Sequence, residues 1–209
     1  MKTVRILVVD DHKIVRTGLK TLLAAERDFE VVAEADDGAA AVRAAREQAP
    51  DVVLIDLMMP GTDGETAIAK LHAEMPSVRT LVLTSYGSSD LLARALKAGA
   101  SGAVLKTADD EVLVTAIRAV AEGQIFLSPD VRRLLKQDPP VPPFTPRQAE
   151  VLSSLARGLT NADIACQLGI CEARVEEHVN AILTKIGAAN RTEAVALAFQ
   201  RHLLKNQNT

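Results

Sequence analysis

Three aspartates stand directly after two short apolar runs of the sequence. Asp10 and Asp11 follow residues 4–9, and Asp56 follows residues 52–55. Each run predicts a β-strand buried on both faces of a parallel sheet. The carboxyl ends of neighbouring parallel strands share one crevice, so we expect the three carboxylates to lie together. Two such charges about 5 Å apart, at an effective dielectric of about 20, repel by about 3 kcal/mol. The cluster therefore calls for a cation, and its oxygen ligands suit Mg²⁺.

For either strand alone, a structural role of the aspartates as helix N-caps or turn formers is the better explanation. The coincidence at both strands favours the cation site. Two further apolar runs end in polar residues, since residues 79–83 precede Thr84 and residues 103–105 precede Lys106. Taken singly, Lys106 is as easily a solvated lysine and Thr84 a β-branched strand residue. Together they supply the hydroxyl donor and the ammonium charge that a bound phosphoryl group needs.

This set of side chains predicts phosphoryl transfer. Asp56 would be the nucleophile, forming an aspartyl phosphate by attack on a phosphorus atom held by Mg²⁺. The metal ligands would be Asp10, Asp11 and Asp56, with the main-chain carbonyl of Met58 as a further ligand. Phosphatases with an aspartate nucleophile share this chemistry, but they typically place a second Asp two residues later. Met58 stands there and cannot transfer protons, so an enzyme is not expected.

In order and spacing, these residues resemble those of a known domain. Residues 1 to about 123 resemble the receiver domain of bacterial response regulators. The resemblance implies that Asp56 is the phosphoacceptor, phosphorylated by a sensor histidine kinase. It also implies that Asp10 and Asp11 bind Mg²⁺. Thr84 would then be the switch hydroxyl and Lys106 the phosphate partner. The match extends to residues 61–64, the turn that opens the next helix.

Two positions depart from the receiver pattern. Receivers commonly carry a Tyr or Phe three residues before the lysine, whose ring turns inward on phosphorylation, and here that position is Ala103. Tyr86, the only tyrosine, is expected to shield the site. Thr107 replaces the proline that follows the lysine in many receivers, so no cis-proline is implied. We therefore expect a weak or unconventional switch.

Strand patterns alternate with helical patterns in the first part of the chain. The helical patterns cover residues 13–25, 38–48, 63–74, 88–98 and 109–122. Five such units predict an α/β fold with a doubly wound, five-stranded parallel sheet, flavodoxin-like as the resemblance implies. Residues 1–123 would form this domain. Residues 124–143 would be a linker with a short helix and a proline-rich segment.

Residues 144–209 predict a second, all-α domain of four helices. Thr145, Pro146 and Gln148 form the pattern of a capping box, and Gly158, Gly169 and Gly187 would end successive helices. The middle pair predicts a helix-turn-helix. Residues 144 to about 204 resemble the LuxR-type helix-turn-helix of NarL-like regulators, carried by residues 145–147, 150–152, 158–161, 164–165, Val175, His178 and Val179.

The charges of this second domain fit DNA binding less well. Residues 145–209 hold seven Lys and Arg against six Asp and Glu, a net charge of +1. Glu176 replaces a lysine that the family usually has in the recognition helix, Asn180 stands at the next groove-facing turn, and Ala162 replaces another common lysine. The candidate DNA-binding residues are Arg174, Glu176, Glu177, Asn180, Lys185 and Arg191, with Arg157 as a further phosphate contact.

Composition excludes several other classes of protein. The chain has 209 residues, 48% of them hydrophobic, with a net charge of −3 that argues against nonspecific binding of polyanions. No apolar run approaches the length of about 20 residues of a membrane span. A strand pattern begins within a few residues of Met1, so we expect no signal peptide. Cys166 and Cys171 are expected to be reduced thiols of a cytoplasmic protein.

The leading interpretation is a two-component response regulator. Phosphorylation of Asp56 would control homodimerisation and the binding of promoter DNA. The last helix could supply one dimer interface through Ala194, Leu197, Ala198 and Leu204, although these positions are as easily domain core. The alternative is a protein-interaction or dimerisation module with weak or no DNA binding, which Glu176, Glu177 and Ala162 suggest.

Overall fold

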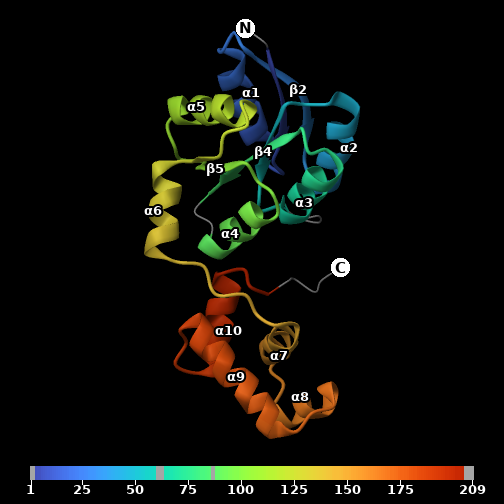
Figure 1. Cartoon of the computed structure of the whole chain (residues 1–209), viewed down its shortest axis with the longest axis vertical. Coiled ribbons are helices and arrows are strands. Elements are labelled where there is room, and N and C mark those ends of the chain that lie inside the picture. The colour runs from blue at the N-terminus through green and yellow to red at the C-terminus, as the bar shows by residue number, and fades with distance from the viewer. Residues whose placement is uncertain (1–2, 60–63, 86–87, 205–209) are drawn as a thin grey trace. The chain divides into compact units, whose positions relative to one another are not determined.

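The computed structural model describes residues 3–59, 64–85 and 88–204, and Figure 1 shows the whole chain. The chain divides into two compact units, residues 1–138 and 139–209. Each unit has its own hydrophobic core. The unit boundary lies later than the domain boundary at residue 123 that the sequence suggests.

The first unit is built on a parallel sheet. Its strands follow the spatial order β2-β1-β3-β4-β5-β6, and every pair of neighbours is parallel. The α/β class and the doubly wound sheet are confirmed. The strands are β1 (Val4–Val9), β2 (Phe29–Ala35), β3 (Val52–Asp56), β4 (Arg79–Thr84), β5 (Gly102–Leu105) and β6 (Phe126–Leu127).

The sheet has six strands where the sequence predicts five. The sixth strand, β6, has only two residues, which are too few to show the periodicity of a strand in the sequence. Its formation depends on the edge of β5, because the main-chain N–H of Phe126 donates to Ser101 and that of Ser128 donates to Ala103. Tertiary pairing therefore adds the strand.

Helices cover both faces of this sheet. Alternate strand residues point to opposite faces, so that Leu7, Val53 and Val82 enter one core and Ile6, Leu54 and Leu81 the other. The first core is closed by α2 (Gly38–Gln48), α3 (Gly64–Glu74), α4 (Ser89–Lys97) and α6 (Pro129–Gln137). The second core is closed by α1 (Lys13–Ala24) and α5 (Asp110–Ala121).

Helix α6 packs on the first unit, although its residues fall in the segment that the sequence assigns to the linker. Ser128 caps the helix by accepting from the N–H of Val131, and the Val131 side chain is fully buried in the core beside Ala103. At the other end, the Ser89 hydroxyl of α4 donates to Asp138 over 2.8 Å. Figure 1 shows α6 beside β5 and α4.

The second unit is all-α, as expected, with α7 (Pro146–Ala156), α8 (Asn161–Leu168), α9 (Glu172–Ile186) and α10 (Arg191–Gln200). Thr145 and Gln148 form a capping box at α7, and Thr160 and Asp163 form another at α8. Gly169 ends α8 at φ +65°, which a residue without Cβ adopts freely. Neither unit contains a helix, within the described residues, that is long and apolar enough to cross a membrane.

Candidate functional site: an acidic pocket and a helix-turn-helix

The sheet brings Asp10, Asp56 and Lys106 into contact. Asp10 follows β1, Asp56 ends β3 and Lys106 follows β5, so all three lie at the carboxyl edge of the sheet. The Lys106 Nζ atom lies 2.5 Å from Asp10 Oδ2 and 2.6 Å from Asp56 Oδ2. Asp10 is 1% exposed and Asp56 4% exposed. The strand ends thus bring together two buried carboxylates and one ammonium group.

The ammonium group of Lys106 offsets the repulsion between the two carboxylates. Burial of the side chain disfavours its charged form and by itself would lower the pKa of Lys106. The hydrogen bonds to Asp10 and Asp56 outweigh burial, and the pKa of Lys106 is raised. The lysine therefore carries its charge at neutral pH and can neutralise anionic oxygen atoms in this pocket.

Asp11 lies beside Asp10 and is a candidate ligand for a cation. Its Oδ1 atom is buried without a hydrogen bond, although His12 Nδ1 lies 2.8 Å away at ion-pair distance. Asp10 holds His12 and Arg16 in place through two hydrogen bonds. Its Oδ1 atom accepts from the main-chain N–H of His12 over 2.8 Å, and its main-chain carbonyl accepts from the Arg16 side chain over 2.6 Å. Ligand atoms of Asp10, Asp11 and His12 lie within 4.8 Å of one another. The carboxylate oxygen atoms of this group are suitable donors for a hard divalent cation.

His12 and Arg16 are absent from the residues that sequence reasoning selects. His12 directly follows the aspartate pair and contacts both of its members. Arg16, in the first turn of α1, donates to the main-chain carbonyl of Asp10. An arginine at this place in a helix is common and gives no signal of a role. Only the position of His12 next to the acidic pair could have signalled a role.

Met58 and Thr84 lie beside the pocket without entering the lysine bridge. The Met58 N–H donates to Asp56 Oδ1 over 3.2 Å, which places the Met58 main chain next to this carboxylate. The Thr84 hydroxyl is buried and donates to the carbonyl of Ser85 over 2.9 Å. Two expected parts of the site, the segment 61–63 of the turn and Tyr86, lie outside the described residues.

Gly64, at the start of α3, approaches the main chain of the phosphoacceptor candidate closely. A Cβ atom added to Gly64 would lie 2.4 Å from the carbonyl oxygen of Asp56 and 2.9 Å from the Cα of Leu57. Ala103, where receivers commonly carry an aromatic residue, is fully buried in the same core as Val131 of α6. Small residues therefore let α3 and α6 pack tightly beside the pocket.

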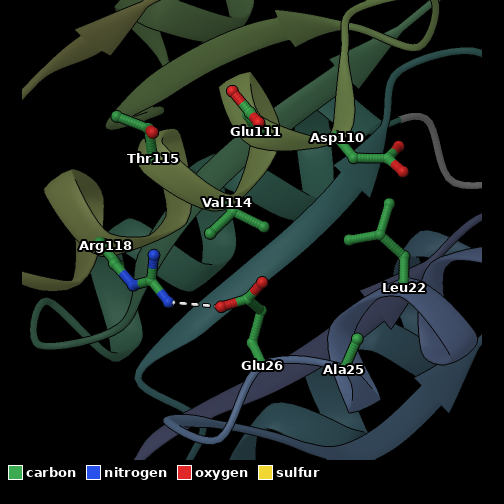
Figure 2. Close-up of a pocket in the computed structure, with 8 residues that line it drawn as sticks. All are labelled: Leu22, Ala25, Glu26, Asp110, Glu111, Val114, Thr115 and Arg118. Atoms are coloured by element: carbon green, nitrogen blue, oxygen red, sulfur yellow. Dashed lines mark hydrogen bonds and ion pairs between the residues drawn. The ribbon is translucent and has the colours of Figure 1, made fainter.

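A hollow of about 450 Å³ between α1 and α5 is distinct from the acidic pocket. Figure 2 shows the residues that line it, with Glu26 and Arg118 joined by an ion pair of 2.7 Å. Arg118 also binds Asp28 and lies over the ring of Phe29, 5.1 Å from its centroid. The hydrogen bond from Arg118 holds the pKa of Asp28 below its usual value. This network fastens α5 to the segment that follows α1.

In the second unit, α9 presents most of the predicted DNA-binding residues. Arg174, Glu176, Glu177 and Asn180 are exposed on this helix, opposite the buried Val175 and Ile182. Arg174 Nη1 lies 2.6 Å from Glu177 Oε2.

The remaining two candidates are engaged inside the unit. Lys185 Nζ donates to the Pro143 carbonyl over 2.7 Å and to Gln148 over 2.8 Å. Arg191 donates to the Leu159 carbonyl over 2.7 Å. Their contact with DNA stays a prediction, and it would require these bonds to be shared or opened. Arg157 is exposed and donates to Ser154 and Gln167.

The fold and the pocket define a class of protein, a receiver unit joined to a helix-turn-helix unit. Comparison with known families agrees. The response regulator receiver domain matches residues 6–118, and the luxR family of bacterial regulatory proteins matches residues 142–198. The response regulator protein VraR of Staphylococcus aureus is 35% identical over 208 residues, which cover 97% of this chain and 100% of that protein.

Solved structures agree with this assignment. The response regulator ChrA of a heme-sensing two-component system is 37% identical, with a TM-score of 0.60 over 98% of this chain and 100% of that chain. RcsB from Salmonella enterica serovar Typhimurium, bound to promoter P1flhDC in the presence of the phosphomimetic BeF3-, is 26% identical. Its TM-score is 0.75 over 96% of this chain and 100% of that chain. The chain belongs to the two-component response regulators with a receiver domain and a LuxR-type DNA-binding domain, and it is a transcription regulator.

Proposed function

We propose that Asp56 accepts a phosphoryl group from a sensor histidine kinase, and that this modification controls dimerisation and the binding of promoter DNA. The observation that carries the proposal is the bridge of Lys106 between Asp10 and Asp56. A carboxylate oxygen of Asp56 forms the bond to phosphorus while the bond between phosphorus and the donor nitrogen breaks. Lys106 is placed to neutralise the charge that the phosphoryl oxygens bring.

Mg²⁺ fits the oxygen atoms beside this lysine. Asp10, Asp11 and Asp56 would hold it, together with the main-chain carbonyl of Met58. Ligand atoms of Asp10 and Asp11 already lie together, and the main-chain N–H of Met58 contacts the Asp56 carboxylate. Bound there, the cation would neutralise the phosphoryl oxygens and orient them for transfer. The buried Oδ1 atom of Asp11, which lacks a hydrogen bond, supports this assignment. Thr84 would then turn its hydroxyl from the Ser85 carbonyl to the phosphoryl group.

The output step would be binding of a homodimer to promoter DNA through α8 and α9. A dimer fits two half-sites about one helical turn apart. RcsB was solved bound to a promoter, and that likeness supports promoter DNA as the partner of this chain. DNA and a kinase that phosphorylates a receiver also imply a cytoplasmic location. On α10, Ala194 and Ala198 are fully buried in the unit's own core, so the interface would use other residues.

A second candidate function is a protein-interaction module. The exposed surface of α9 carries Glu172, Glu176 and Glu177 beside Arg174, an acidic balance that phosphate groups disfavour. Tight dimers without binding to any DNA sequence would favour this alternative.

Replacement of Asp56 by Asn tests the phosphorylation step. We expect Asp56→Asn to abolish incorporation of labelled phosphoryl groups from acetyl phosphate with Mg²⁺, because an amide oxygen is a far weaker nucleophile. The exposed Asp36→Asn serves as the matched control and should incorporate label like the wild-type protein. Unchanged circular dichroism would show that both variants fold. Labelling of Asp56→Asn at the wild-type level would refute the assignment.

A further inference from the structure

On the helix α9, the exposed carboxylate of Glu176 occupies a position from which a recognition helix contacts DNA bases. Glu176 and Asn180 are exposed and four residues apart, so their side chains lie one turn apart on the same side of the helix. The opposite side is held in the core by Val175 and Ile182. A recognition helix of this motif enters the major groove with the side that its domain core leaves exposed. Glu176 would therefore meet base edges.

The two neighbouring glutamates of α9 differ in their partners. Glu177 is neutralised by Arg174, whose Nη1 atom lies 2.6 Å from Glu177 Oε2. Within the part of the chain that the structure describes, the Glu176 carboxylate has no ion pair or hydrogen bond. Its two oxygen atoms are thus available to an external hydrogen-bond donor.

DNA offers few such donors to a carboxylate. The phosphates repel it, and in the major groove only the amino groups of cytosine and adenine donate, whereas guanine and thymine present acceptors. A carboxylate pairs with the N4 amino group of cytosine, while an Asn side chain pairs with both N6 and N7 of adenine. Glu176 and Asn180 together match a cytosine close to an adenine.

We propose that Glu176 is a specificity-determining residue that reads a cytosine in the major groove, with Asn180 reading a nearby adenine. This inference rests on the proposed binding of promoter DNA by α9. It names the sequence class of that DNA, a half-site that contains cytosine and adenine within the reach of one helical turn. Glu176 would thus contribute sequence specificity, which a contact to a phosphate does not provide.

Selection of binding sites from random duplex DNA tests the inference. Full-length wild-type protein, Glu176→Gln and Glu176→Lys would each be selected with Mg²⁺ and beryllofluoride at moderate salt. We expect the wild-type protein to enrich a cytosine at one fixed position of each half-site. At that position Glu176→Gln should favour adenine and Glu176→Lys guanine, following the donors and acceptors of the new side chains.

Affinity measurements on the enriched site provide the magnitude. Replacing that cytosine by thymine should weaken binding of the wild-type protein by about 5- to 150-fold, the usual range for one specific base contact. The exposed Glu172→Gln, on the first turn of the same helix, removes the same charge and should keep the cytosine preference. Circular dichroism would confirm that each variant is folded.

The outcomes separate this inference from the proposed function. An enriched site whose bases are the same for the wild-type protein and both Glu176 variants overturns the role of Glu176 and leaves DNA binding intact. Absence of any enriched site, with folded dimers, overturns both. An enriched site for Glu176→Lys alone would show that the glutamate excludes DNA, which also overturns the inference.

Discussion

The buried cluster at Lys106 in the first unit and the helix surfaces of the second unit hold their charged side chains in opposite ways. In the first unit, Lys106 joins two nearly buried carboxylates that are 96 and 50 residues away in the sequence. In the second unit, the pairs Arg147–Glu150 and Arg174–Glu177 are three residues apart and exposed. Charges held together by a fold depend on it strongly, whereas charges paired within one helix turn contribute little to stability. The first arrangement suits a site whose chemistry must be preorganised, and the second suits a surface that meets an external partner.

Removal of the Lys106 ammonium group should have the largest effect on stability. Lys106→Ala leaves Asp10 and Asp56 facing each other, and we expect a loss of about 3–5 kcal/mol in the free energy of unfolding. Mg²⁺ should restore more stability to this variant than to the wild-type protein, because a bound cation replaces the ammonium charge. Urea unfolding with and without Mg²⁺ measures both. The exposed Lys97→Ala is the matched control and should show neither effect. Equal stability of Lys106→Ala and wild type would break the comparison between the units.

Substitutions at two glycines, Gly64 and Gly169, compare the cost of disturbed tertiary packing with the cost of local backbone strain. Gly64→Ala would push a methyl group against the main chain of Asp56, and we expect it to cost about 2 kcal/mol. Gly169→Ala has no atom within 4 Å of the new methyl group and is strained only by its φ of +65°, so we expect about 1 kcal/mol. Chemical denaturation of the full chain, followed with probes in each unit, measures both. The reverse ranking would show that local conformation dominates.

The network on Arg118 should produce a smaller, pH-dependent effect. The hydrogen bond from Arg118 lowers the pKa of Asp28 in the folded state, so the stabilisation is present above the unfolded pKa, near 3.9, and is lost as the pH falls through the folded value. Asp28→Asn should therefore be less stable than wild type at pH 7, and the difference should shrink below about pH 4. Arg118 is 42% exposed, which limits the size of the effect. Urea unfolding across this pH range, with Asp36→Asn as control, measures it. A constant difference would contradict the linkage.

The smallest effect on stability is expected for Arg174. Its pair with Glu177 is exposed and local, so Arg174→Ala should leave the urea midpoint unchanged within error. The same variant should weaken binding to a selected DNA site and reduce the salt dependence by about 0.9 in slope if Arg174 contacts one phosphate. Titrations of DNA at several salt concentrations test this. A large loss of stability would show that the second unit also relies on its surface ion pairs.

The sequence by itself determined most of the local structure and the meeting of Asp10, Asp56 and Lys106 at one edge of the sheet. Short apolar runs predict the strands β1, β3, β4 and β5, and the polar residues at their ends converge because parallel strands share one edge. The caps at Thr145 and Gly169 are local, since each depends on hydrogen bonds or dihedral angles within a few residues. Such features can be predicted because their causes lie within short stretches of sequence.

Only the tertiary structure decided how long-range partners meet. The strand β6 forms on an edge supplied by β5, and α6 packs on the first unit through Val131 and the bond of Asp138 to Ser89. The tertiary structure also bonds Lys185 to Pro143 and Gln148. The sequence alone shows only a lysine that is a candidate for DNA contact. These contacts join groups that are distant in the sequence. The pattern of apolar and polar residues does not indicate which lysine or which short apolar segment will find a partner. The three-dimensional fold fixes that choice by placing donors and acceptors within bonding distance.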